Sequence, residues 1–149
     1  MDAGVDFRSG IRLLARLARL AERTCVAAGI SLPQYRLLVS ASRRPQRACE
    51  LADAVGVSRP TLTALVDGLE DAGLVRRVPE PTDGRGTLLE LTRAGHDATS
   101  RAERALTARL LELIDGDVED LVGHVKSVVL ELGAALDRES AGTGRRASV

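Results

Sequence analysis

The chain has 149 residues, of which 44% are apolar and 28% charged, a balance that is ordinary for one globular domain with a core of its own. With one Phe, one Tyr and no Trp, the core must be built from Leu, Val and Ala, which favours helices over sheet. Two Cys and two His are too few for a disulfide framework or a metal site, so we predict no metal, no cofactor and no enzymatic activity.

The formal net charge is zero, which by itself argues against a nucleic-acid partner. The distribution of the charge points the other way, because Arg36 to Arg47 hold four basic residues and no acidic one. From Gly95 onward the chain has seven basic and ten acidic residues. We find no apolar run of about 18 residues and no signal-peptide pattern, and therefore expect a cytoplasmic protein with no membrane partner.

Residues 1–29 are predicted to form a long helix from Phe7 to Ala28, which Gly29 ends. Its apolar residues cover two neighbouring faces, which is more than a one-sided surface helix needs. We therefore expect this helix to contact a second subunit. The apolar positions are Ile11, Leu13, Leu14, Leu17, Ala18, Leu20, Ala21 and Cys25.

The segment 30–95 is predicted to begin with a helix over Gln34–Ser42, opened by Leu32-Pro33 and ended by Arg43-Arg44-Pro45. Its inward-facing residues are predicted to be Leu37, Leu38 and Ala41.

Two short helices with a tight turn between them are predicted next. Gly56 can adopt the left-handed conformation that ends the first, and Ser58 is a natural N-cap for the second. This spacing is the signature of a helix-turn-helix. The predicted buried positions are Ala48, Leu51, Ala52 and Val55 in the first helix, and Leu62, Leu65, Val66 and Leu69 in the second.

The remaining positions at the start of the second helix are small or form hydrogen bonds, which suits a helix that lies against base edges. Arginine can bind guanine through two hydrogen bonds, and Ser or Thr can reach phosphates or a thymine methyl group. The alternative is an ordinary amphipathic helix with a good cap. The predicted DNA-binding residues here are Ser58, Arg59, Pro60, Thr61, Thr63 and Ala64, with Arg47 ahead of them.

A two-stranded hairpin is predicted from Leu74–Val78 and Thr87–Leu91, joined by the turn PEPTDGRG. Arg77 is a predicted DNA-binding residue on the first strand. Arg85 lies near the tip of the turn, where a lone arginine can enter a minor groove. The alternative for Arg85 is a solvated loop residue.

Residues 96–139 are predicted to supply two more dimerisation helices, Arg93–Ile114 and Val118–Leu136, separated by Asp115-Gly116-Asp117. A monomeric helical bundle is the alternative. The small, polar tail 140–149 is predicted to be disordered.

Taken together, these segments resemble the MarR family of bacterial transcriptional regulators over most of the chain. The run Glu70 to Arg77, then Asp83-x-Arg85 and Leu91-Thr92-x-x-Gly95, is the most specific part of the resemblance. The matching residues before it are Leu51-Ala52, Val57-Ser58, Thr61, Val66 and Leu69.

The resemblance implies a mainly α fold with a small β-hairpin, in which a winged helix-turn-helix is flanked by N- and C-terminal dimerisation helices. It also implies a homodimeric, ligand-responsive repressor that binds a pseudo-palindromic operator in double-stranded DNA. Asp67 and Asp83 would position the wing. A small-molecule effector would occupy a pocket lined by Leu13, Leu17, Tyr35, Leu38 and Val39.

Two alternatives remain. Ala64 and Gly68 stand where relatives often carry basic or longer polar residues, which favours a winged-helix module that binds a protein instead of an operator. Some relatives sense peroxides through a cysteine near the start of the first helix, whereas Cys25 is near its end. We therefore predict that Cys25 is a core residue, with a cysteine-based redox sensor as the alternative.

Overall fold

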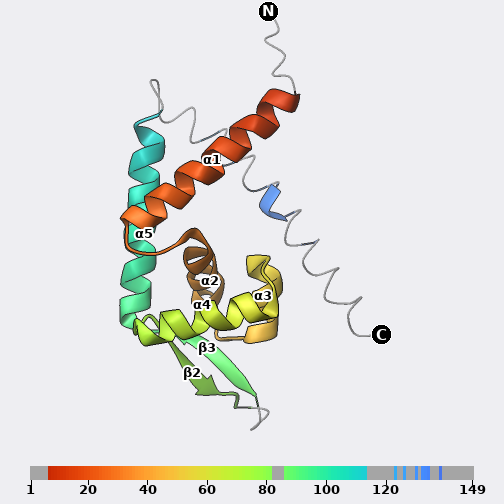
Figure 1. Ribbon diagram of the computed structural model, residues 1–149, viewed down its shortest axis with the longest axis vertical. Helices are drawn as coiled ribbons and strands as arrows, with labels where there is room; N and C mark the ends of the chain where they lie inside the picture. Colours follow the sequence, from red (N-terminus) through yellow and green to blue (C-terminus); the bar gives the residue numbers. More distant parts are fainter. Residues whose placement is uncertain are drawn as a thin grey trace, which may run out of the picture. The chain divides into compact units, whose positions relative to one another are not determined.

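The computed structural model describes residues 7–81 and 86–113, and separately residues 123, 126, 130, 132–134 and 138 (Figure 1). The side chains of Phe7, Cys49 and Asp53 are not described. The predicted break at 115–117, the tail 140–149 and most of the predicted helix Val118–Leu136 lie outside the described residues. The chain forms two compact units, Met1–Arg109 and Leu110–Val149, and the elements below belong to the first apart from the end of the last helix.

The described elements confirm a mainly helical fold with a small antiparallel sheet, and the predicted helices are present within a few residues of their expected ends. In the helix predicted over Arg93–Ile114, the last helical residue is Leu111. The elements are α1 (Phe7–Ala27), α2 (Leu32–Ser42), β1 (Gln46–Arg47), α3 (Ala48–Val55), α4 (Arg59–Asp71), β2 (Val75–Pro79), β3 (Thr87–Leu91) and α5 (Arg93–Leu111).

The sheet has three strands in the order β1-β3-β2, so the prediction of a two-stranded hairpin was incomplete. The missed strand, β1, has only two residues, and Gln46 and Arg47 lie opposite Leu89 and Leu88 of β3. A two-residue strand shows no alternation of apolar and polar residues, and its pairing depends on a partner some forty residues away. The local sequence therefore could not indicate it.

The core lies where α2, α3 and α4 meet the sheet and the first turns of α5. Each of α2, α3 and α4 buries the predicted face, but two residues differ from the prediction. Ala48 is exposed because it is the first residue of α3, and Leu65 is half-buried at the edge of the buried face of α4. The core side chains include Leu37, Leu38, Leu51, Val55, Leu62, Val66, Leu69, Val75, Leu89 and Leu91.

The start of α5 is fastened to the end of α4 and to the strand that follows it. The Thr92 hydroxyl donates to the carbonyl oxygen of Gly73 at 2.7 Å, and accepts from the backbone N–H of Gly95 at 3.0 Å. Gly95 is buried, and a Cβ at this position would collide with the carbonyl oxygen of Leu74. The Thr-x-x-Gly spacing thus allows close backbone contact between α5 and the start of the hairpin.

Helix α1 is anchored at one end only. Cys25 is fully buried near its C-terminus, whereas Ile11, Leu13 and Leu14 are more than half exposed along its N-terminal half. This helix extends away from the body that carries β2 and β3 (Figure 1). In the described part of the chain, no helix has the length and apolarity that crossing a bilayer requires.

The Leu69→Ala variant should lower the free energy of unfolding by about 2–5 kcal/mol, because Leu69 is fully buried and its removal leaves a cavity. Leu65→Ala, at a half-buried position of the same helix, is the control and should cause a smaller loss. Urea denaturation of both variants measures the difference. A Leu69→Ala variant as stable as the wild type would show that α4 does not bury this face.

Candidate nucleic-acid interface

The turn between α3 and α4 has the local geometry that its sequence predicts. Gly56 has φ +72°, in the left-handed region, and its N–H bonds to the carbonyl oxygen of Ala52. Ser58 is the N-cap of α4, and its hydroxyl lies 2.8 Å from that of Thr61 and accepts from the Thr61 N–H at 3.4 Å. These contacts fix the direction in which α4 leaves the turn.

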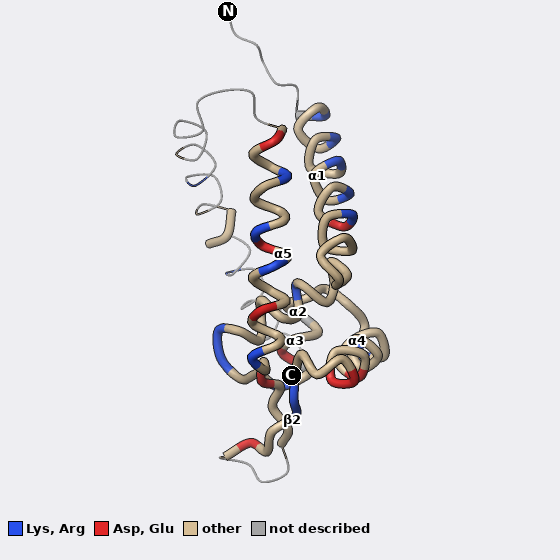
Figure 2. Tube along the Cα trace, turned by 90° about the vertical axis from the view of Figure 1, so that its left-hand side faces the viewer, with Lys and Arg blue, Asp and Glu red and all other residues tan. Residues whose placement is uncertain are grey.

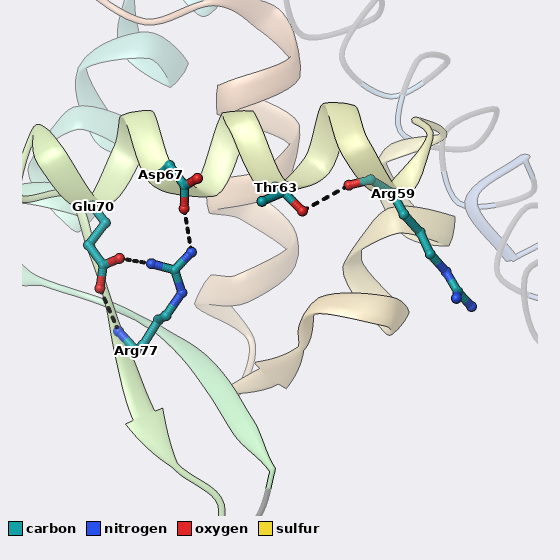
Figure 3. Close-up of polar contacts among 5 residues, drawn as sticks. All are labelled: Arg59, Thr63, Asp67, Glu70 and Arg77. Atoms are coloured by element: carbon teal, nitrogen blue, oxygen red, sulfur yellow. Dashed lines mark hydrogen bonds and ion pairs between the residues drawn. The ribbon is translucent and has the colours of Figure 1, made fainter.

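The first turns of α4 present the predicted recognition residues to solvent. Arg59, Pro60, Thr61, Thr63 and Ala64 are all exposed, while Leu62, Val66 and Leu69 on the opposite side are buried. The Thr63 hydroxyl donates to the carbonyl oxygen of Arg59 at 3.1 Å, and the Arg59 side chain extends away from the helix (Figure 3). Among the described residues, no carboxylate pairs with Arg59.

Arg77 joins the sheet to α4. Its guanidinium donates to the Asp67 carboxylate at 2.5 Å and to the Glu70 carboxylate, and its backbone N–H donates to Glu70 at 3.4 Å (Figure 3). Both acidic residues lie on α4, so one side chain of β2 holds the hairpin against this helix. Asp67 thus contacts the wing in the way that the family resemblance implies, whereas Arg77, predicted to bind DNA, is held by two carboxylates.

Arg47 is also paired, at the base of the hairpin. Its Nε and Nη2 donate to Oε2 of Glu80 at 2.8 and 2.7 Å, which connects β1 to the residue after β2. The Glu80 backbone N–H donates to the carbonyl oxygen of Gly86 at 2.9 Å and closes the loop between the strands. Gly86 has no room for a Cβ beside the Glu80 carboxylate. Asp83 and Arg85, between these two residues, lie outside the described residues.

Most arginines around this surface are neutralised by nearby carboxylates. Residues 48–94 hold five basic and eight acidic residues, so the winged part has an acidic balance. Arg59, like Arg93, has no carboxylate partner in the described structure. The pairs are Arg44 with Glu50, Arg47 with Glu80, Arg76 with Glu90, and Arg77 with Asp67 and Glu70.

A hollow of about 100 Å³ lies between α4 and the sheet and is lined by Thr63, Arg77, Thr87 and their neighbours, which do not include the residues predicted to line an effector pocket. Of the predicted pocket residues, Leu38 is fully buried in the core and Leu13 is 52% exposed. Leu17, Tyr35 and Val39 are half-buried.

Cys25 lies in the core, near Tyr35. Burial raises the pKa of the Cys25 thiol above its ordinary value of 9.0. Burial also raises the pKa of Tyr35, with smaller contributions from the Glu103 carboxylate and Cys25. The described residues contain no group of three His, Cys, Asp or Glu side chains that could hold a metal ion.

Sequence reasoning did not identify Glu70 and Glu80 as residues of the interface. Both are acidic residues next to a turn or helix end, a place where a solvated carboxylate is common. The available signal was the presence of Arg77 and Arg47, either of which could pair with a carboxylate across the fold. That partner could be named only once the register of β1, β2 and β3 was known.

These elements form a winged helix-turn-helix, with α3 and α4 as the helix pair and β2 and β3 as the wing. A model of the MarR family matches residues 28–86. An HTH-type transcriptional regulator of Mycobacterium leprae (strain TN) is 30% identical over 138 residues, covering 89% of this chain and 96% of that protein. The chain therefore belongs to the MarR family of transcriptional regulators.

Solved structures show the same fold. The multiple antibiotic resistance repressor MarR superposes with a TM-score of 0.71 at 24% identity, over 89% of this chain and 95% of that one. NadR in complex with 4-hydroxyphenylacetate superposes with a TM-score of 0.68 at 24% identity, over 90% of this chain and 92% of that one.

The Arg77→Ala variant should lose about 1 kcal/mol of stability and exchange amide hydrogens faster in β2 and β3, because the sheet loses its link to α4. Arg76→Ala is the control: Arg76 is the neighbouring residue and also pairs with a carboxylate, but that carboxylate, Glu90, is on the sheet itself. It should change stability by less than about 0.5 kcal/mol. Equal exchange rates in both variants would contradict the role of Arg77.

Cys25 should react slowly with a thiol reagent at pH 8 in the folded protein and rapidly after denaturation, measured in a Cys49→Ser background. Its raised pKa leaves less thiolate at a given pH than in the unfolded chain. The same shift stabilises the folded state below the unfolded pKa, and this contribution is lost as the pH rises through the folded pKa. Fast modification of the native protein would show that the thiol is accessible.

Proposed function

We propose that this MarR-family regulator binds DNA by inserting the first turns of α4 into a major groove. The proposal rests on the observation that α4 has one buried face and one exposed face. Its buried face fixes the helix in the core, while Arg59 and Thr63 on the opposite face are exposed and Arg59 has no carboxylate partner among the described residues. Arg47, Ser58, Pro60, Thr61, Ala64, Arg77 and Arg85 would complete the contact surface.

Asp67, Asp83, Glu70 and Glu80 would act as positioning residues in this proposal. The contacts of Asp67 and Glu70 with Arg77 hold the wing at a fixed angle to α4. The pair between Arg47 and Glu80 supports the base of the loop that carries Arg85. Since Arg47 and Arg77 are already paired, phosphate contact by either would require exchange of a carboxylate for a phosphate.

The protein would act as a homodimer in the cytoplasm. Support comes from exposed apolar side chains on α1, at the end of α5 and just beyond it: Ile11, Leu13, Leu14, Leu110, Leu111 and Leu113. Residues 1–29 and 96–139 would build the dimer, and 30–95 would form the DNA-binding domain. Two α4 helices, about 34 Å apart, would then contact two half-sites of a pseudo-palindromic operator.

The dimer would be a repressor released by a small molecule. NadR, which has the same fold, is seen with 4-hydroxyphenylacetate, an aromatic anion, and we extend this class of effector to the present chain. Leu13, Leu17, Tyr35, Leu38 and Val39 remain the proposed lining. Because Leu38 is fully buried, ligand entry would require the α1–α2 region to open, which would favour a dimer that no longer matches the operator.

A winged-helix module that binds a protein is the second candidate, favoured by the acidic balance of residues 48–94 and by the exposed, uncharged Ala64 and Gly68. A cysteine-based sensor receives no comparable support, since the Cys25 thiol is fully buried. Regulation rather than catalysis is the activity that the family implies.

Titration of the DNA that flanks the protein's own gene should show specific binding that weakens with salt and exceeds binding to an unrelated duplex. Arg59→Ala should weaken the specific complex by about 1–3 kcal/mol, because a bidentate base contact is lost. Asp71→Ala, an exposed position at the other end of α4, is the control. Binding no tighter than to the unrelated duplex at any salt concentration would favour the protein-binding module.

A further inference from the structure

Five arginines form a continuous stripe along α1. Arg8, Arg12, Arg16, Arg19 and Arg23 are all exposed, and Figure 2 shows them recurring along one side of this helix. At 3.6 residues per turn they fall within an arc of about 80°, and at 1.5 Å per residue the stripe is about 22 Å long.

The stripe is not balanced by acidic residues on its own helix. Glu22 is the only acidic residue of α1. Among the described residues, no carboxylate pairs with Arg12, Arg16, Arg19 or Arg23. In the winged part, by contrast, Arg76 and Arg77 each have a carboxylate partner.

Neighbours in the stripe lie three or four positions apart, as in the pairs Arg8–Arg12, Arg12–Arg16 and Arg19–Arg23. Like charges at this spacing destabilise a helix. An anionic partner that runs along the stripe would remove this repulsion.

The position of the stripe leaves it open in the proposed dimer. The exposed Leu13 and Leu14 and the half-buried Leu17 lie on the other side of α1, about 140–240° around the helix from the first arginine. A second subunit can therefore cover the apolar side while the arginines stay in solvent. The N-terminal end of α1 also points away from β2 and β3 (Figure 1).

We propose that the stripe binds the phosphate backbone of a second DNA segment, separate from the operator beneath α4. One DNA strand has a phosphate every 3.4 Å or so along the axis, so a stripe of about 22 Å runs beside about six phosphates. The guanidinium group is suited to each of them, because its planar fork donates two hydrogen bonds. DNA offers the unbroken line of negative charge that five aligned arginines fit, and the winged domain already brings the protein to it.

The test uses the full chain and a mixed-sequence 30-bp duplex. One biotinylated copy is fixed to beads, and capture of a second, labelled copy by the protein is measured together with solution affinity at several salt concentrations. The stripe variant is Arg16→Gln/Arg19→Gln. The control is Arg101→Gln/Arg104→Gln, which makes the same change at the same spacing on the exposed side of α5.

The stripe variant should lose most of the capture and should reduce the slope of log affinity against log salt by about two per chain, since each phosphate contact contributes about 0.9. The control should behave like the wild type. Arg16→Lys/Arg19→Lys should restore most of the binding, because the charge is kept.

Three outcomes would overturn the proposal: no capture by the wild type, equal capture by the stripe and control variants, or loss of the dimer in the stripe variant by sedimentation. The last would show that the stripe faces an acidic surface of a second copy. Operator binding is measured separately and depends on Arg59. A protein that fails on the operator but captures the mixed duplex would refute the proposed function and leave the stripe proposal intact.

Discussion

The packing of α4 in the core is the interaction on which the rest of the interface depends. Leu62, Val66 and Leu69 leave this helix only one orientation, in which Arg59 and Thr63 face outward. The cap at Ser58 sets where the helix starts, and the contacts of Arg77 set where the wing lies relative to it. The core side chains and the proposed recognition residues therefore lie on opposite sides of the same thirteen-residue helix.

In this protein, the pairing of individual charged side chains is more informative about binding surfaces than the net charge is. The winged part, residues 48–94, has an acidic balance, and Arg76 and Arg77 in it are held by carboxylates, so a count of charges says little about which arginines can reach a ligand. Arg59 and, on α1, Arg12, Arg16, Arg19 and Arg23 have no carboxylate partner among the described residues. A zero net charge is thus compatible with local surfaces that are strongly basic.

The helices and the exposed face of α4 could be predicted from the sequence because the signals are local. The spacing of Leu62, Val66 and Leu69, with Gly56 and Ser58 at the turn, defines a buried face and a cap within a dozen residues. The third strand and the pair between Arg47 and Glu80 could not be predicted, because each joins residues far apart in the sequence. The family resemblance implied that Asp67 positions the wing, but the contact of Glu70 with the same arginine was not foreseen. An arginine looks the same in a sequence whether it will contact a phosphate or a carboxylate.

The junction at Thr92 and Gly95 joins α5 directly to the segment between α4 and the wing, without a flexible linker. The Thr92 hydroxyl bonds to Gly73, two residues beyond the end of α4, and Gly95 lets the helix backbone lie directly against Leu74, which leads into β2. A tilt of α5 would therefore move α4 and the wing with it, because the start of α5 contacts the segment that connects them. A movement that begins in the long helices would rotate α4 and the wing as one rigid body, and their positions relative to each other would not change.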